Sequence, residues 1–442
     1  MNIFILPSEG ARVGLPSLLV LFASLVATVT APLGAQEARR VTLAEAVAEA
    51  RANHAQVGIA EARSLAAQEQ ITAAGASRWP TLGLEAGVLS STDPVAVFGG
   101  RLRQGRFTQA DFDPALLNDP DALTDFDGAL VLGWSPVDFS RDAALGAARA
   151  NAEAADLGAR WARRVAGYQA EVRYVEAAGA ELMLGAARSA TEAAEANFSL
   201  VERHAAEGVV TDADVLRARA ALEDARARQI VAEQGVDDAR GRLALALGWP
   251  AGTVPAPVVD SEGLVAEAPV HSEEGGRADL AASEAQIRAA AQVANQASRA
   301  RLPRIQGFAR LEAHANESFS DSGDSWTVGL RVSVPLFTGF EVGARSAAAK
   351  AELEAVTLGH AQRLDEARTS LAEARRGAES RRRAALAAEA SAEAAEEAAR
   401  LMRLRFDEGL ATTAELLAAE AAAVRQHTAA VHARLEHRIA TA

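Results

Sequence analysis

The chain has 442 residues, of which 49% are apolar, and its formal net charge is −14. An acidic balance without a dense Lys/Arg cluster excludes a typical nucleic-acid-binding protein. Cysteine is absent, which excludes disulfides, thiolate metal sites and cysteine nucleophiles, and the aromatic content of only 5% favours long, closely packed helices.

The first 35 residues are typical of a secretory signal peptide. Arg12 precedes an apolar run from Leu15 to Val29, and small residues around Ala31 and Ala35 offer cleavage sites. The run is shorter than the about 20 residues that a membrane span requires, so we favour a cleaved signal over a membrane anchor. No later stretch is long and apolar enough for a spanning helix, so we expect any membrane crossing to be made by strands.

The first half of the mature chain, taken as 36–250, contains both helical and strand patterns. Helical spacing of apolar residues, interrupted near His54, predicts helices at about 43–79, 139–207 and 211–247. Apolar residues that alternate with polar residues or glycine predict strands at about 81–90 and 127–136. Pro80 and Pro136 are expected at the strand–helix junctions. Residues 92–126, rich in Asp, Pro, Gly and Asn, are predicted to form a loop too long for a tight hairpin.

The second half, taken as 251–442, repeats this order. Helices are predicted at about 279–302, 339–408 and 412–440, and strands at about 304–314 and 326–335. Pro303 and Pro335 take the places of Pro80 and Pro136, and Glu408-Gly409 corresponds to Glu207-Gly208. The sequence therefore predicts an internal duplication that supplies four strands and several long helices.

The predicted strands are amphipathic. In the last one, every second residue from Trp326 to Val334 is apolar, whereas the residues from Thr327 to Ser333 between them are polar or glycine. Four strands cannot close a barrel, because the smallest transmembrane barrels have about eight, and unpaired edges are not tolerated in lipid. Several copies of the chain must then share one barrel, and the residues leave open whether two, three or four.

The long helices are predicted to pack through a seam of small residues. Positions seven residues apart in the second half are mostly alanine, and they are Leu364, Leu371, Ala378, Ala385, Ala392, Ala399 and Phe406. In the first half Val215, Leu222, Val236 and Leu243 form a similar seam, with Gln229 as the exception. The alternative from a different class is a periplasmic coiled-coil scaffold without a membrane barrel.

Several segments resemble the TolC-type outer membrane factors, the exit ducts of drug efflux and type I secretion systems. The run from Val41 to His54 is similar to the opening helix of that family. The segment Val334-Pro-Leu-Phe-Thr-Gly339 resembles its second strand-to-helix junction, and Arg405-Phe-Asp-Glu-Gly409 resembles its helix reversal. The first junction departs from the pattern, because Pro136-Val-Asp-Phe139 replaces the usual Pro-Leu-Phe.

The resemblance implies a mainly α protein that forms a homotrimer. Twelve strands would build one β-barrel in the outer membrane, continued by a long α-helical barrel in the periplasm with a belt near 41–53, 248–276 and the C-terminal end. The implied function is a passive exit duct for small molecules, fed by a periplasmic adaptor and an inner-membrane transporter. The same duct serving type I protein secretion is the alternative within this class.

Two carboxylates beside the helix reversals are the strongest candidate site residues. Asp214 and Glu415 each follow a threonine, Thr211 or Thr412, by three residues, which is the spacing of a capping box. The resemblance adds a second role, in which Asp214 and Glu415 ring a closed periplasmic entrance and hinder or select ions. The family often has another acid where Ala418 stands here, so we expect a less acidic gate.

The remaining candidates lie at the same reversals. Gly208 and Gly409 are expected to turn the chain, since glycine accepts positive φ, and in the resembled family these tips also meet the adaptor. Phe406 is expected either to pack in the helix seam or to serve as a pore-lining or tip-contact residue. The sequence contains no zinc-protease pair, nucleophile elbow, phosphate loop or dinucleotide fingerprint, so we predict no enzyme activity, metal or cofactor.

Overall fold

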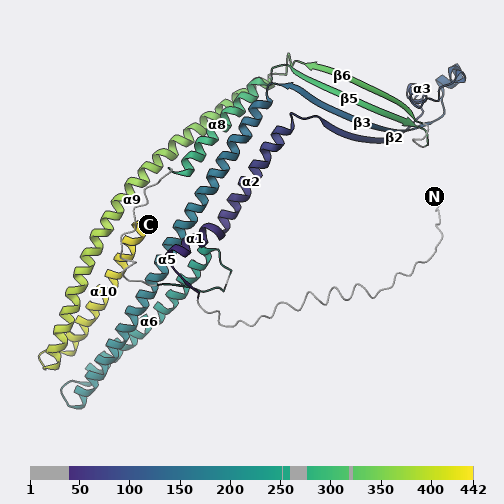
Figure 1. The fold of residues 1–442 in the computed structure, drawn as a ribbon. Coiled ribbons are helices and arrows are strands. Elements are labelled where there is room, and N and C mark those ends of the chain that lie inside the picture. Colours follow the sequence, from purple (N-terminus) through teal and green to yellow (C-terminus); the bar gives the residue numbers. More distant parts are fainter. Residues whose placement is uncertain (1–38, 251, 259–275, 318–321, 442) are drawn as a thin grey trace, which may run out of the picture.

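The structure, a computed structural model, describes residues 39–250, 252–258, 276–317 and 322–441. The signal peptide expected over residues 1–35 lies outside the described residues. The described chain is elongated, with a four-stranded sheet at one end and two helical hairpins at the other (Figure 1). Among the described residues, no helix combines the length and the apolar character needed to span a bilayer.

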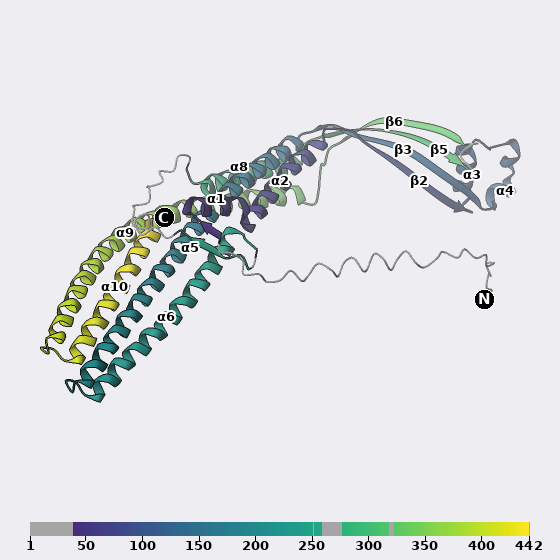
Figure 2. The same ribbon diagram turned by 60° about the horizontal axis from the view of Figure 1, so that its bottom comes forward.

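Two very long helices connect the sheet to the far end. They are α5 (Arg141–Ala206) and α9 (Glu341–Asp407), with 66 and 67 residues. At about 1.5 Å per residue each is about 100 Å long. Helices α5 and α9 both run from the sheet to the far ends of the helical hairpins, called the tips here, and the shorter helices lie alongside them (Figures 1 and 2).

The shorter helices repeat one arrangement twice. They are α1 (Leu43–Asn53), α2 (Ala55–Ala76), α6 (Asp212–Leu247), α8 (Ala278–Arg299) and α10 (Thr413–Thr441). Near the sheet, α2 packs on α5 and α8 packs on α5 and α9, whereas near the tips α6 packs on α5 and α10 on α9. The predicted helical region 43–79 divides at His54, whose extended backbone and Nδ1 cap the start of α2. The internal duplication is therefore visible in the fold.

The predicted alanine seam is buried only in the tip half of the molecule. Ala385, Ala392, Ala399 and Phe406 of α9 are buried where α10 covers them, but Leu371 is exposed. Small side chains let the paired helices approach closely. In the first half the matching seam on α6 is buried at Leu222, Val236 and Leu243.

The main sheet is antiparallel throughout, in the order β2-β3-β5-β6. Its strands are β2 (Thr81–Ser91), β3 (Leu123–Asp138), β5 (Arg304–Ala315) and β6 (Gly323–Ser333). A second, small parallel pair joins β1 (Arg39–Val41) to β4 (Pro255–Pro257) beside α1, near the middle of the molecule.

The register gives the main sheet one apolar and one polar face. Leu84, Leu130, Leu311 and Trp326 form one row across the strands, and all of them are exposed. The next row, on the opposite face, begins at Glu85 and continues through Ala129, Glu312 and Ser325. Because side chains alternate between faces along a strand, this difference persists over most of the sheet.

Pro136 is not the strand end that the sequence predicts. Strand β3 continues through it to Asp138, and the register shifts between Trp134 and Val137. Proline has no N–H to donate and is tolerated at such a bulge, so it did not stop the strand. Pro80 and Pro303 do lie between a helix and a strand.

The loop expected over residues 92–126 is partly helical, which corrects the prediction. It contains α3 (Pro94–Arg103), the short 3-10 helix η1 (Gln109–Phe112) and α4 (Pro114–Asn118), and β3 already begins at Leu123. Asp93 and Asp113 cap α3 and α4 through hydrogen bonds to backbone N–H groups of Ala96 (2.7 Å) and Ala115 (2.9 Å). In both cases proline occupies the first helical position, where its missing N–H costs nothing.

The junction between β6 and α9 contains an unusual backbone conformation. Pro335 follows the strand, and Phe340 caps α9 with a φ of 69°, in the left-handed region that side chains disfavour. The Phe340 ring meets Phe337 edge to face at 5.6 Å between centroids, and both rings are exposed. The junction therefore presents aromatic surface at the end of the sheet.

Candidate functional site

The two helix reversals share one backbone geometry. Gly208 has a φ of 77°, its N–H donates to Ala205 O at 3.0 Å, and Val209 N–H donates to His204 O at 2.9 Å. This bonding pattern is a Schellman motif, which ends α5 and satisfies its last carbonyls. Gly409, with a φ of 74°, closes α9 through the same pair of bonds.

Each returning helix begins with the predicted threonine–acid pair. Thr211 donates from its N–H (3.1 Å) and its hydroxyl (2.7 Å) to Asp214 Oδ2. Thr412 makes the same bonds to Glu415 Oε2 at 2.8 and 2.9 Å, and Glu415 N–H donates back to the Thr412 hydroxyl at 3.3 Å. The structure thus places both acids in the capping role.

Both carboxylates are held in the charged form. The Thr211 hydroxyl and then its N–H lower the pKa of Asp214, with a further contribution from Arg217, whose Nη1 lies 3.0 Å from Asp214 Oδ1. The Thr412 N–H and then its hydroxyl lower the pKa of Glu415. Neither carboxylate is neutralised by its cap, so both retain a negative charge at neutral pH.

The two reversals are packed together around Phe406. The ring is 3% exposed and lies in one cluster with Val201, Ala218 and Leu416. It stacks on the His204 imidazole of the other hairpin, with 5.3 Å between centroids and 21° between planes. Of the two roles expected for Phe406, the structure supports packing, because a ring so buried is not available at the surface of the tip.

Sequence reasoning missed an ion pair between α9 and α10. Arg403 Nε lies 2.8 Å from Glu420 Oε1, and the Glu420 side chain is largely buried. Glu420 follows Glu415 by five residues, and therefore points to a different side of the helix. The spacing of charged residues within one helix does not show which residue of the neighbouring helix lies opposite, so the sequence did not reveal this ion pair.

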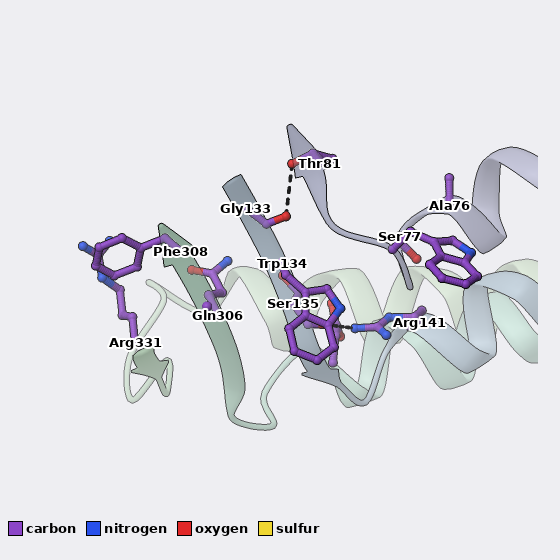
Figure 3. A pocket seen from close by; sticks show the side chains of 13 residues that line it. Ala76, Ser77, Thr81, Gly133, Trp134, Ser135, Arg141, Gln306, Phe308 and Arg331 are labelled. Carbon is purple, nitrogen blue, oxygen red and sulfur yellow. Dashed lines mark hydrogen bonds between the residues drawn. The ribbon is translucent and has the colours of Figure 1, made fainter. Parts of the chain in front are cut away.

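A second polar feature lies where the sheet joins the helices. A cavity of about 590 Å³ is lined there by residues of α2, the α2–β2 connection and all four strands, and by Arg141 at the start of α5. Figure 3 shows Trp134 and Arg141 in its centre and Phe308 beside Arg331 at one side. Trp134 Nε1 donates to Arg78 O at 3.1 Å, which fixes the indole ring.

The comparisons with known proteins bear on this arrangement. A family model described as outer membrane efflux protein matches residues 46–249 and 270–442. The chain belongs to this family, the TolC-type outer membrane factors. Its members are channels rather than enzymes, and the chain is accordingly an outer membrane protein whose helices extend into the periplasm.

One curated relative matches over part of its length. Protein CyaE of Bordetella pertussis (strain Tohama I) is 31% identical over 279 residues, which amount to 59% of this chain and 55% of the relative. The chain thus spans about half the length of that relative.

Solved structures of outer membrane proteins have the same fold. A membrane protein from Pseudomonas aeruginosa matches with a TM-score of 0.76 at 22% identity, over 90% of both chains. The outer membrane protein VceC from Vibrio cholerae matches with a TM-score of 0.72 at 22% identity, over 90% of this chain and 94% of that one. The CmeC outer membrane channel of Campylobacter jejuni gives 0.73 at 16% identity, over 90% and 83%.

Proposed function

We propose that three copies of this chain form one outer membrane exit duct that conducts small molecules outward from a periplasmic adaptor and an inner-membrane transporter. Three sheets of four strands would give 3 × 4 = 12 strands in a single closed barrel. The long helices would continue the duct across the periplasm, with the hairpin tips at its inner entrance.

The observation that carries the proposal is the isolated amphipathic sheet. Strands β2 and β6 form its edges, and among the described residues neither has a partner on its outer side. One face exposes a continuous set of apolar side chains, including Leu84, Leu330 and Trp326. Unpaired backbone groups are costly in lipid, so a sheet of this kind becomes stable there only when neighbouring copies pair edge to edge.

The negative charges of Asp214 and Glu415 are proposed to form an electrostatic barrier to anions at the inner entrance. Each lies in the first turn of its helix, beside an exposed reversal, and each keeps its charge. In a trimer the two acids would recur three times around one opening, and such rings favour cations over anions. Gly208 and Gly409, with Thr211 and Thr412 next to them, are the proposed adaptor contacts.

Conductance in planar bilayers tests this role. Asp214→Asn and Glu415→Gln remove the charges but retain a side-chain oxygen that can accept the threonine bonds, so the caps survive. We expect the double variant to conduct more or to lose cation preference relative to wild type. Thr412→Val, which weakens the cap and keeps the charge, is the matched control. Unchanged conductance and selectivity in the double variant would reduce the two acids to caps.

Assembly is tested separately by fractionation of cells that express the chain. A heat-modifiable trimer in the outer membrane, recovered together with an adaptor, is the expected result. A soluble periplasmic monomer would refute the duct.

A further inference from the structure

We propose that the polar face of the sheet, at the end that joins the helices, carries a binding subsite for aromatic anions, centred on Arg331 and Phe308. The ligand class is a planar aromatic ring bearing a carboxylate or sulfonate group. The proposal rests on the proposed function in one respect, because only in a closed barrel would this face line the duct.

The two named side chains lie on the same face of adjacent strands. Phe308 is paired with Gly329 and Gln306 with Arg331 in the β5–β6 register, so all these positions share the polar side. The Arg331 guanidinium lies over the Phe308 ring, 5.9 Å from its centroid. A side-chain carbon at Gly329 would meet the Phe308 ring at 2.6 Å, so the glycine leaves room for the ring to lie flat on the strand.

Arg331 differs from Arg304 and Arg310, the other two arginines on this face in the β5–β6 pair. Arg304 Nε lies 3.8 Å from Asp138 Oδ2. Arg310 is held by Glu312 (2.5 Å) and Glu85 (2.8 Å), which together offset its charge. No carboxylate in the described part of the chain lies within ion-pairing distance of Arg331, and its side chain is exposed. A guanidinium with free donors beside an aromatic face is a suitable partner for a bidentate oxyanion.

The surroundings of Arg331 favour an anion with an apolar body. The cavity of about 590 Å³ is within the range of small-molecule pockets. Trp79 and Trp134 also line it, although Trp134 belongs to the apolar row of β3 rather than to the polar face. Its one lining carboxylate, Asp138, already accepts bonds from Ser140 N–H (2.9 Å) and from the Ser140 hydroxyl. Arg141 adds a second cation to the lining (Figure 3).

Isothermal titration calorimetry of the purified chain in detergent, with naphthalene-2-sulfonate as the probe, tests the subsite without requiring a conducting channel. We expect Arg331→Gln to weaken binding by roughly tenfold, the loss of one charge-assisted hydrogen bond, and Phe308→Leu to weaken it as well. Arg345→Gln is the matched control, because that arginine is paired with Glu341 at 2.6 Å and is not part of the cavity lining.

Two results would overturn the subsite. The first is that wild type and Arg331→Gln bind the probe with equal affinity. The second is that wild type binds methanesulfonate, which lacks the ring, as tightly as it binds naphthalene-2-sulfonate. Channel recordings with the same proteins separate the two proposals. A chain that binds the probe but forms no channels would refute the duct alone, whereas channels without probe binding would refute the subsite alone.

Discussion

Replacing Phe406 with alanine should loosen the contact between the two helical hairpins at their tips. The ring is 3% exposed, it packs with Val201 and Leu416, and it stacks on His204. Removal of a buried phenylalanine side chain typically costs about 3–5 kcal/mol, because transfer free energy is lost and a cavity remains. Divided by about 1.4 kcal/mol per tenfold change, the local opening equilibrium should shift by roughly two to three and a half orders of magnitude.

Amide hydrogen exchange measures this opening directly. We expect protection factors of the amides at 198–206, in the last turns of α5, to fall by at least a hundredfold in Phe406→Ala, although the substitution lies in α9. Leu410→Ala in the same reversal is the control, since Leu410 is 63% exposed and its truncation should change local stability by less than about 0.5 kcal/mol.

One pattern of exchange would refute the predicted coupling between the hairpins. If exchange accelerates only in α9 and α10 while α5 keeps its wild-type protection, Phe406 does not couple the hairpins. The ring would then stabilise its own hairpin alone.

Two further predictions concern backbone geometry and pH. Gly248→Ala should lower the melting temperature, because the residue has a φ of 72° and a side-chain carbon would lie 2.4 Å from Asn53 O. Gly241→Ala, in an open position within α6, is the control and should raise the free energy of unfolding by about 0.5–1 kcal/mol. Equal melting temperatures of the two variants would contradict this geometry. The pKa values of Asp214 and Glu415 are lowered in the folded protein, so both acids stabilise the tips fully above the ordinary carboxyl range. This stabilisation is lost as pH falls through the lowered pKa values. Amide protection factors at the tips, corrected for intrinsic exchange, should therefore decline below about pH 4. The Asp214→Asn, Glu415→Gln variant should not show this decline, and an identical pH profile in it would exclude these acids as the cause.

The strands were predictable because alternation is a local property of the sequence. Strand β2 was expected at 81–90 and occupies Thr81–Ser91, and the alternation from Trp326 onward also marks β6. Pro136 misled the prediction, since a proline reads as a strand end and nothing local indicates a bulge. The helices in the long loop had a readable signal in Asp93-Pro94 and Asp113-Pro114, an N-cap followed by proline.

The candidate site was only half predictable, for a related reason. The capping pairs Thr211–Asp214 and Thr412–Glu415 span three residues each, so their spacing alone revealed them. The stack of His204 on Phe406 joins residues about two hundred positions apart. Helical periodicity identifies which face of a helix is buried, but it contains no information on which distant helix covers that face.

The left-handed Phe340 implies that a subunit on its own is less stable than its fold would permit. A non-glycine residue in this conformation costs about 1–2 kcal/mol, and the ring that occupies it is 82% exposed in the single chain. Within the described part of the chain the ring meets Phe337 edge to face, but that ring is exposed as well. In the proposed trimer, insertion beside acyl chains or contact with a sister protomer would bury the Phe340 ring and so offset the cost, and the junction would then favour the assembled duct over the free chain.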